Sequence, residues 1–561
     1  MPDILPYLFE GWSHVRKGKE MRREFVNVLR QPDFAAGAME DSSFRFEERG
    51  VQEECPVSYE YIVQDDCAKI IVYPGGKPVK YLKLRFEGDL SFVNRVMGDQ
   101  WERSYGNLAP LEWRSVKADR VLPWFCYLIG DGQAACYGVR TGANCFAFWQ
   151  VDTHGITLFL NLMCGNAGTD LREAIVAAEV IQSISEKEST IYQSACSFAS
   201  RMCEKPILPK TPVFGVNNWY WAYGNISKES VLQETEYLCE MTEGTTHRPY
   251  MIIDDGWQLN RTYGPGAYIG GPWMPNDRFP DMHKLTSSIH EKDVNTGIWF
   301  RPLLTLGRIP EEAKLAVSAG GQIMDPSHPY TLERVQKDAA AIAGMGFDLI
   351  KHDFTTIDIF GSGLFEREHG VSFCKEDRCF YDQTKTTAMI VKELYRAIQE
   401  GVGQSLVLGC NVIGHLSAGI HALQRVGDDT SGRSFEWTVR NGVNSMMRLP
   451  QNGKFFMIDP DCAAFTEKVS ADRNLDFLEM CAFTGVTTLA SVKPGILTSA
   501  QMERIRSIYH MADQGGCGLG IENFDKTALP ECFASDDGVM RRSFNWESEY
   551  HGSRCLLSFM Q

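Results

Sequence analysis

Two kinds of hydrophobic pattern divide the chain. Up to about residue 205, short segments alternate apolar and polar positions between turn residues, as in AKIIVYPGGKPVKYLKLRF and ITLFLNL. This alternation is typical of antiparallel strands that have one buried and one solvated side. The proline-rich segment CEKPILPKTP then marks a domain boundary. We therefore predict an N-terminal antiparallel β-sandwich domain over residues 1–205.

After this boundary, short β-branched or aromatic runs alternate with helical stretches such as KESVLQETEYLCEMT and TLERVQKDAAAIAGM. Eight such β-α units over about 290 residues have the size of a (β/α)8 TIM barrel. We assign the barrel to residues 206–515 and a short C-terminal β-unit, with VMRRSFNWESEY and CLLSFM, to residues 516–561. The predicted barrel strands are VFGVNNW, PYMIIDD, TGIWFRP, DLIKHDF, SLVLGCN, ALQRVGD, KFFMIDP and TTLASV.

Composition narrows the class of protein. The chain has 561 residues, of which 44% are hydrophobic, enough for a large core. We expect no membrane partner, because the sequence has neither an apolar leader behind a basic start nor about 18 consecutive apolar residues. The net charge of −16 argues against a nucleic-acid partner. Most of the 17 cysteines lie in apolar runs, which is typical of free thiols in a reducing compartment and predicts a cytoplasmic protein.

Polar side chains follow six successive predicted strands at the point where each strand ends. In a TIM barrel the reactive groups come from these carboxyl ends, where loops and not core packing decide the residue. We therefore expect one site to gather Asp254, Asp255, Trp257, Trp299, Arg301, Lys351, Asp353, Cys410, Arg425, Asp428, Asp429, Asp459 and Asp461.

The fourth predicted strand ends in a charged pair, Lys351 and Asp353. Side chains two positions apart point to the same side of a strand, here towards the axis and mouth of the barrel. A nearby ammonium favours the ionised carboxylate, so Asp353 would serve as a nucleophile or as a stabiliser of a cation. The alternative is an ion pair that only closes the end of the barrel.

A second carboxylate is expected at the end of the sixth strand, where Asp429 is our choice and Asp428 the competing one. Strands four and six lie about 10 Å apart, and inward-leaning aspartates reduce this to roughly 5–7 Å. That separation suits a retaining glycoside hydrolase, in which one carboxylate attacks and the other transfers a proton. An acid at Asp429 needs a raised pKa. The alternative for RVGDDTSGR is a helix N-cap.

A sugar presents hydroxyl groups and an apolar face of C–H groups. Carboxylates and basic side chains bind the hydroxyls, and indole rings cover the apolar face. For each tryptophan alone, core packing is the alternative. The set that meets this description is Asp254, Asp255, Lys351, Arg301, Arg425, Trp219, Trp257 and Trp299.

These residues stand in motifs that resemble the α-galactosidase clan of glycoside hydrolases, especially family 36 and more distantly family 27. The motifs, in order, are WERSYGNL, GVNNW, IDDGWQ, GIWFRP, IKHDF, GCNVIG, RVGDDTSG and IDPDC. The resemblance implies a retaining α-glycosidase for a terminal α-D-galactosyl unit, with Asp353 as the nucleophile and Asp429 as the acid/base. It also implies an oligomer.

The resemblance implies further roles in sugar binding. Lys351 would bind the 3- and 4-hydroxyls, and Asp254 and Asp255 the 4- and 6-hydroxyls. Trp219 and Trp257 would form the apolar wall, Asp461 would line the site, and Arg425 would lie near the 2-hydroxyl together with Cys410. The shortened C-terminal part, Asp428 and His352 depart from the family pattern and bear on which sugar is bound.

Several functions remain open at this point. Within the enzyme class, the alternatives are an α-N-acetylgalactosaminidase and a transglycosylase that transfers galactose to another sugar. From another class, the chain would be a sugar-binding barrel without turnover. A metal-dependent barrel enzyme is less favoured, because no His-x-His pair ends a strand. We expect no metal and no organic cofactor.

Overall fold

The computed structural model describes residues 23–39, 45–46, 55–103, 108–117, 119–259, 269–318, 320–363, 373–375 and 378–546. The predicted segment CLLSFM and the centre of WERSYGNL, residues 104–107, lie outside these ranges. The chain forms two compact units. The first comprises Met1–Trp101, Pro110–Glu204 and Phe360–Lys392, and the second Glu102–Ala109, Lys205–Ile359 and Glu393–Gln561. The domain limits at residues 205 and 515 stay predictions.

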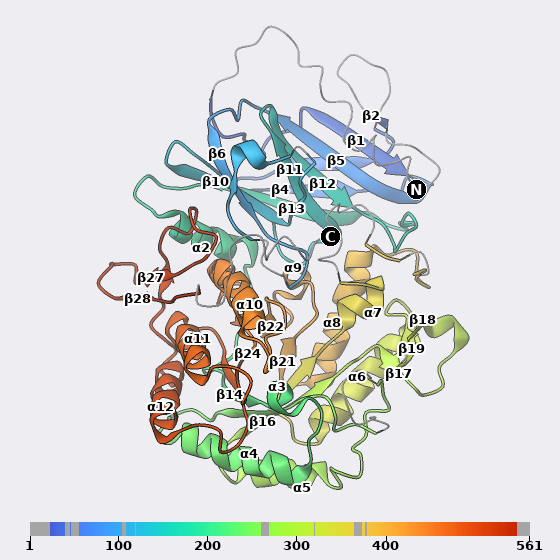
Figure 1. Cartoon of the computed structure of the whole chain (residues 1–561). Coiled ribbons are helices and arrows are strands. Elements are labelled where there is room, and N and C mark those ends of the chain that lie inside the picture. The colour runs from blue at the N-terminus through green and yellow to red at the C-terminus, as the bar shows by residue number, and fades with distance from the viewer. Residues whose placement is uncertain are drawn as a thin grey trace. The chain divides into compact units, whose positions relative to one another are not determined.

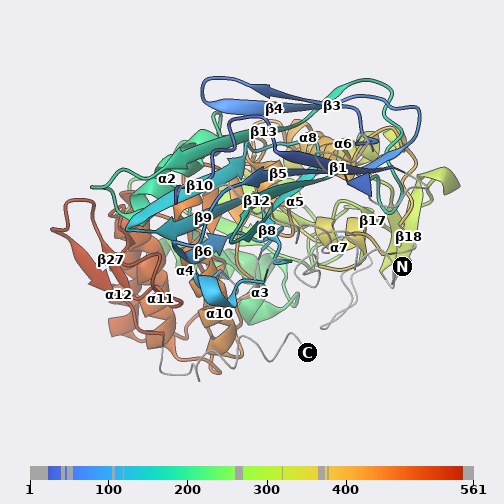
Figure 2. The same ribbon diagram turned by 90° about the horizontal axis from the view of Figure 1, so that it is seen from above.

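The first unit contains two antiparallel sheets, as the alternating pattern predicts (Figure 2). Aromatic side chains fill its core, for example Phe148 stacked on Phe159 with ring centroids 4.5 Å apart. One sheet has the order β2(Arg45–Phe46), β1(Phe34–Met39), β5(Val79–Glu87), β12(Gly155–Asn161), β11(Phe146–Asp152), β8(Leu122–Pro123). The other has the order β3(Tyr59–Val63), β4(Cys67–Val72), β13(Ile175–Ile184), β10(Gln133–Val139), β9(Phe125–Gly130), β6(Val93–Gly98), β7(Leu111–Glu112). Helix α2(Ile191–Met202) follows β13.

The second unit holds a parallel sheet that closes into a TIM-like barrel (Figure 1). All eight predicted strands are present. The seventh is broken after Asp459, and its two halves pair with different neighbours, β23 with β22 and β24 with β25. Since β25 also pairs with β14, the ring is complete. The strands are β14(Phe214–Asn217), β15(Tyr250–Ile253), β16(Asn295–Phe300), β20(Leu349–His352), β21(Leu406–Gly409), β22(Leu423–Arg425), β23(Met457–Asp459), β24(Cys462–Phe465) and β25(Thr488–Val492).

Helices alternate with these strands, as a βα-repeat requires. Helix α12 illustrates their local signals, because Thr498 and Gln501 form a capping box at its start. The helices are α3(Trp219–Ala222), α4(Lys228–Met241), α5(Met282–His290), α6(Pro329–Gly344), α7(Thr355–Phe360), α8(Thr387–Val402), α9(Gly414–Ser417), α10(Phe435–Met447), α11(Ala471–Thr484) and α12(Ser499–Asp513). Within the described residues, none is long and apolar enough to span a membrane.

Two small antiparallel sheets complete the second unit. The first was not predicted and joins β17(Leu304–Thr305), β19(Gly321–Met324) and β18(Lys314–Ser318) after barrel strand β16. The second lies where the C-terminal β-unit was predicted and consists of β26(Gly520–Ile521), β27(Cys532–Ala534) and β28(Arg541–Ser543).

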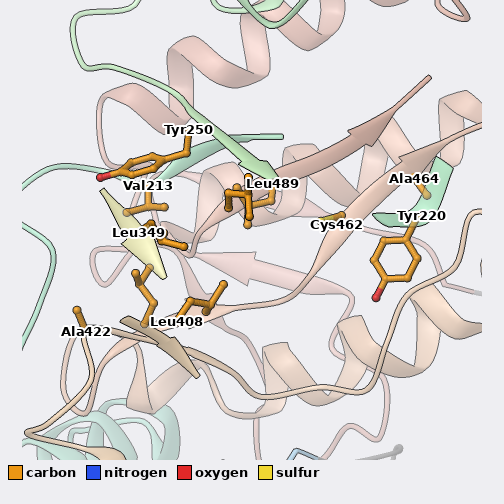
Figure 3. Close-up of a cluster of buried hydrophobic side chains, with 11 residues drawn as sticks. Val213, Tyr220, Tyr250, Leu349, Leu408, Ala422, Cys462, Ala464 and Leu489 are labelled. Atoms are coloured by element: carbon orange, nitrogen blue, oxygen red, sulfur yellow. The ribbon is translucent and has the colours of Figure 1, made fainter. Parts of the chain in front are cut away.

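Apolar side chains from several barrel strands pack into one buried cluster (Figure 3). Ile252, Leu349, Leu408 and Leu423 come from four different strands and are at most 2% exposed. Because side chains alternate along a strand, the residue two positions further on each strand points to the same side. Those residues are Asp254, Lys351, Cys410 and Arg425, so the packed cluster ends where the polar site begins.

Candidate active site

Asp353 follows β20, and both of its carboxylate oxygens are held by donors. Trp299 Nε1 donates to Oδ2 over 3.2 Å, and the backbone N–H of Phe354 donates to Oδ1 over 2.7 Å. Phe354 has φ 64°, in the left-handed region that bulky residues rarely adopt. Such strain persists only where the surroundings enforce it, and it clusters at functional sites. The turn after β20 therefore fixes the direction of the Asp353 carboxylate.

Lys351 forms its ion pair with a different carboxylate from the one that we expected. Its Nζ lies 2.7 Å from Asp254 Oδ2, and both side chains are almost completely buried. Burial is the largest single influence and disfavours the ammonium, but Asp254, with smaller contributions from Cys410 and Asp353, raises the pKa of Lys351. Lys351 thus stays positively charged beside Asp353, although the hydrogen bond that holds it comes from the second strand end.

Asn217 and Asn218 complete the environment of Asp254. Asn217 Nδ2 donates to Asp254 Oδ2 over 2.8 Å, and Asn218 Oδ1 accepts from the Asp254 backbone N–H over 2.9 Å. These two asparagines belong to the GVNNW motif at the end of β14. The side-chain amides of these two asparagines thus bring the end of the first strand into the site. The sequence pattern did not indicate this role.

Arg425 connects three carboxylates on the other side of the site. Its Nε donates to Asp459 Oδ2 over 3.1 Å, its Nη2 to Asp461 Oδ1 over 2.6 Å, and its Nη1 to Asp429 Oδ1 over 3.2 Å. Asp461 also accepts hydrogen bonds from the Tyr220 hydroxyl and the Thr430 backbone N–H. The end of the seventh strand thus holds Arg425 within hydrogen-bonding distance of Asp429.

Arg103 is a residue of this site that the sequence analysis missed. It lies in the segment Glu102–Ala109, which belongs to the same compact unit as the barrel. Its Nη1 donates to Asp429 Oδ1 over 2.7 Å, and its Nη2 lies 3.7 Å from Asp428 Oδ1. The arginine stands inside the quoted motif WERSYGNL, but nothing in that motif indicates a partner 326 residues away.

Asp429 does not have the raised pKa that we expected. Desolvation acts to raise it, but the charges of Arg103, Arg425 and Lys351 outweigh desolvation and lower the pKa of Asp429. The side chain is 51% exposed, so solvent partly screens these attractions. Our expectation did not include the guanidinium of Arg103.

Its neighbour Asp428 behaves in the opposite way. The Asp428 side chain is only 6% exposed, and burial raises its pKa to about 7, although Arg103 works against this shift. Two interacting carboxyl groups titrate as a pair, and the macroscopic pKa values belong to both. The pair therefore retains one proton up to about neutral pH. Of the two side chains, Asp429 is the exposed one.

Three of the predicted sugar-binding residues are mainly held by protein partners. Trp257 is fully buried, and its Nε1 donates to the Trp299 carbonyl over 2.8 Å. Arg301 Nε donates to Asp358 Oδ2 over 2.9 Å, and Asp255 Oδ1 accepts from Gln258 Nε2 over 2.6 Å. These contacts place the three side chains around the site as supports, and direct contact with a sugar stays a prediction for them.

Trp219 and Cys410 occupy two further sides of the site. Trp219 begins α3 directly after β14 and is half-buried, with its ring centroid 5.5 Å from that of Tyr223. Cys410 is buried, and burial followed by the charge of Asp353 raises the pKa of its thiol, so that it stays neutral. Its Sγ accepts a long hydrogen bond of 3.9 Å from Arg103 Nη1.

Two aspartates at this site combine a fixed carboxylate with a partly exposed one, Asp353 and Asp429 respectively. Asp353 favours the charged form of Lys351, and Lys351 favours the ionised form of Asp429. The two aspartates are therefore coupled electrostatically through this lysine. Carboxylates and basic groups of this kind can bind a neutral polyol and stabilise a developing positive charge.

Neither a comparison with models of protein families nor one with curated proteins finds a match for this chain. Solved structures do match it. An α-galactosidase from Thermus thermophilus in complex with p-nitrophenyl α-D-galactopyranoside has 15% identity and a TM-score of 0.57, over 87% of this chain and 99% of that one. A GH36 α-galactosidase from Geobacillus stearothermophilus has 12% identity and a TM-score of 0.56, over 91% of this chain and 80% of that one.

The α-galactosidase of Lactobacillus brevis is similar at 13% identity with a TM-score of 0.55, over 91% of this chain and 79% of that one. At such identities the likeness concerns the fold, which is a sandwich followed by a TIM-like barrel in this chain. The match extends over most of both chains, so it includes more than the common barrel alone.

Proposed function

We propose that this protein is a retaining glycoside hydrolase that releases terminal α-linked D-galactose, with Asp353 as the nucleophile and Asp429 as the acid/base. The observation that carries the proposal is the environment of these two acids. Asp353 is anchored by donors on both oxygens, whereas Asp429 is half-exposed and anchored on one oxygen. Solved proteins of this fold carry galactosides, among them p-nitrophenyl α-D-galactopyranoside and raffinose.

The reaction follows a double displacement. Asp353 attacks the anomeric carbon and forms an aspartyl ester while Asp429 gives a proton to the leaving oxygen. Asp429, then ionised, takes a proton from water, and the water attacks the anomeric carbon, which breaks the bond to Asp353 and releases the sugar. The positive charge that develops on the sugar is stabilised by the carboxylate of Asp353, whose position Trp299 and the Phe354 amide hold.

The ion pair of Asp254 and Lys351 supports selection of galactose. Both groups are buried, so a sugar that left either of them without a hydrogen-bond partner would lose about 1–3 kcal/mol of binding free energy. An axial 4-hydroxyl reaching this pair would therefore be preferred over its equatorial epimer.

Kinetics on two classes of α-galactoside test the proposal. Asp353→Asn should lose at least about 10³-fold in kcat on every substrate, because no covalent intermediate can form. Asp429→Asn should lose activity mainly on substrates with a poor leaving group, such as raffinose, and much less on a nitrophenyl α-galactoside. Equal losses on both substrates would contradict the role of Asp429.

A matched control excludes a general effect of removing a carboxylate. Asp472 is exposed on α11, so Asp472→Asn should keep the wild-type rate on both substrates. A panel of nitrophenyl glycosides should give turnover with α-galactoside and little with the α-N-acetylgalactosaminide. Absence of turnover on every glycoside in the wild-type protein would overturn the proposed function in favour of a sugar-binding barrel.

A further inference from the structure

The carboxylate of Asp429 is held in an asymmetric way. Among the described residues, both of its hydrogen bonds end on Oδ1, from Arg103 Nη1 at 2.7 Å and from Arg425 Nη1 at 3.2 Å. An oxygen that accepts from two guanidinium groups is a poor place for a proton. The proton of an acid at this position therefore belongs on Oδ2, and the side chain as a whole is 51% exposed.

The two arginines differ in what else they hold. Arg425 is tied to Asp459 and Asp461 on the broken seventh strand, so its position is set within the barrel. Arg103 comes from a distant segment and is 7% exposed, with contacts to Asp429, Asp428 and Cys410. Of these two arginines, Arg103 forms the shorter hydrogen bond to Asp429 and also an ion pair with Asp428.

We infer that Arg103 is a positioning residue for the acid/base, one that ties Asp429 Oδ1 to Asp428 and Cys410 and so turns Oδ2 towards the leaving oxygen. This inference rests on the proposed function. The guanidinium has a second effect, because its charge favours the ionised forms of Asp428 and Asp429. It therefore sets the pH at which the pair gives up its proton.

Both effects have a defined direction when Arg103 is replaced. Without its charge the pKa values of Asp428 and Asp429 both rise, since Arg103 lowers each of them. An acid with a higher pKa stays protonated to higher pH, so the alkaline limb of the kcat/KM profile moves upwards. Without its hydrogen bond Asp429 is free to turn, which weakens proton donation to poor leaving groups most.

The experiment compares Arg103→Gln and Arg103→Lys in the full-length protein. Arg103→Gln keeps a donor but no charge, and we expect its alkaline limb to move up by about one pH unit. Its kcat on raffinose should fall about 10–100-fold, and its kcat on a nitrophenyl α-galactoside less than about threefold. Arg103→Lys keeps the charge without the fork, so it should retain the wild-type alkaline limb and share the leaving-group defect.

Arg440→Gln is the matched control. Arg440 is also buried, but its carboxylate partner is Glu436 on the same helix, so this variant should retain the wild-type pH profile and leaving-group dependence. Thermal unfolding of each variant shows which variants are folded. The comparison uses the ratio of kcat values on the two substrates, because the amount of folded protein cancels in this ratio.

A failure of the inference and a failure of the proposed function give different results. An unshifted alkaline limb in Arg103→Gln, or an equal loss on both substrates, would overturn the role of Arg103 while α-galactosidase activity stands. If Arg103→Lys and Arg440→Gln gave the same ratio of kcat on raffinose to kcat on the nitrophenyl α-galactoside, the role of Arg103 would be overturned as well. A wild-type protein inactive on both galactosides would instead overturn the proposed function itself.

Discussion

The charge of Asp429 depends on neighbours that act in opposite directions. Arg103 and Arg425 favour its ionised form, whereas a charged Asp428 opposes ionisation through repulsion. Asp428 is buried and holds a proton up to about pH 7, so at lower pH it is a neutral neighbour. Asp428 therefore helps to decide when Asp429, the proposed acid/base, carries a proton.

This dependence leads to a prediction for Asp428→Asn. The amide is neutral at every pH, so the repulsion that raises the pKa of Asp429 at higher pH is removed. The alkaline limb of kcat/KM on a nitrophenyl α-galactoside should therefore lie at lower pH in the variant than in the wild-type protein. The shift is thus opposite in sign to that of Arg103→Gln. An upward shift would show that Asp428 does not act through repulsion.

Single residues also mark the limit of inference from the sequence. Alternation along β20 correctly places Lys351 and Asp353 at one strand end, but it cannot tell which carboxylate the lysine pairs with. That depends on the distance between neighbouring strands, and the structure gives the pair to Asp254. Arg103 was missed for a related reason, because a contact across 326 residues leaves no local periodic signal.

At the scale of elements, helix α4 carries a buried acid that contacts helix α3, directly after the first barrel strand. Its Glu234 is 3% exposed, and Glu234 Oε2 accepts from Trp221 Nε1 over 3.2 Å just after β14. Burial raises the pKa of Glu234 to about 8, although the bond from Trp221 acts against this. Near neutral pH the helix therefore contributes a protonated glutamic acid to the core.

Glu234→Gln tests that account through stability. The unfolded chain loses this proton near the ordinary glutamate pKa of 4.5 and the folded protein near 8, so the wild-type free energy of unfolding falls as pH rises between these values. At about 1.4 kcal/mol per pKa unit, the contribution of Glu234 to this fall is at most about 5 kcal/mol. Urea unfolding at several pH values should show a flatter dependence for Glu234→Gln.

Glu236→Gln serves as the control for this measurement. Glu236 lies on the same helix but is mostly exposed beside Lys292, so its replacement should leave the wild-type pH dependence unchanged. A pH dependence of Glu234→Gln that equals that of the wild-type protein would mean that Glu234 is already ionised in the folded state.

Elements were more predictable than their connections. The eight barrel strands are short runs with strong apolar character, and each was found because burial inside a parallel sheet demands such a run. The break of the seventh strand was not foreseen. Pro460 lacks the N–H that a ladder needs, and Asp461 has φ 65°, so the strand ends after Asp459 and resumes at Cys462. That break turns Asp461 towards Arg425.

At the scale of the whole molecule, the second unit brings together residues from positions 103 to 461 at one end of a closed ring of strands. The apolar cluster below fixes the strands, and the residues two positions further supply Asp254, Lys351, Cys410 and Arg425. The polar residues at the strand ends could be predicted, because they follow from strand alternation and barrel topology, whereas the position of Arg103 could not. The oligomer that the family resemblance implies stays a prediction.

Labelling with a covalent galactose-type inactivator tests the central claim most directly. After inactivation, mass spectrometry of the digested protein should find one galactosyl group esterified to Asp353, within the segment LIKHDFTT. Excess galactose should slow the labelling, and Asp353→Asn should remain unlabelled. A galactosyl group on another carboxylate, or hydrolysis that continues without any label, would contradict the assignment of Asp353 as the nucleophile.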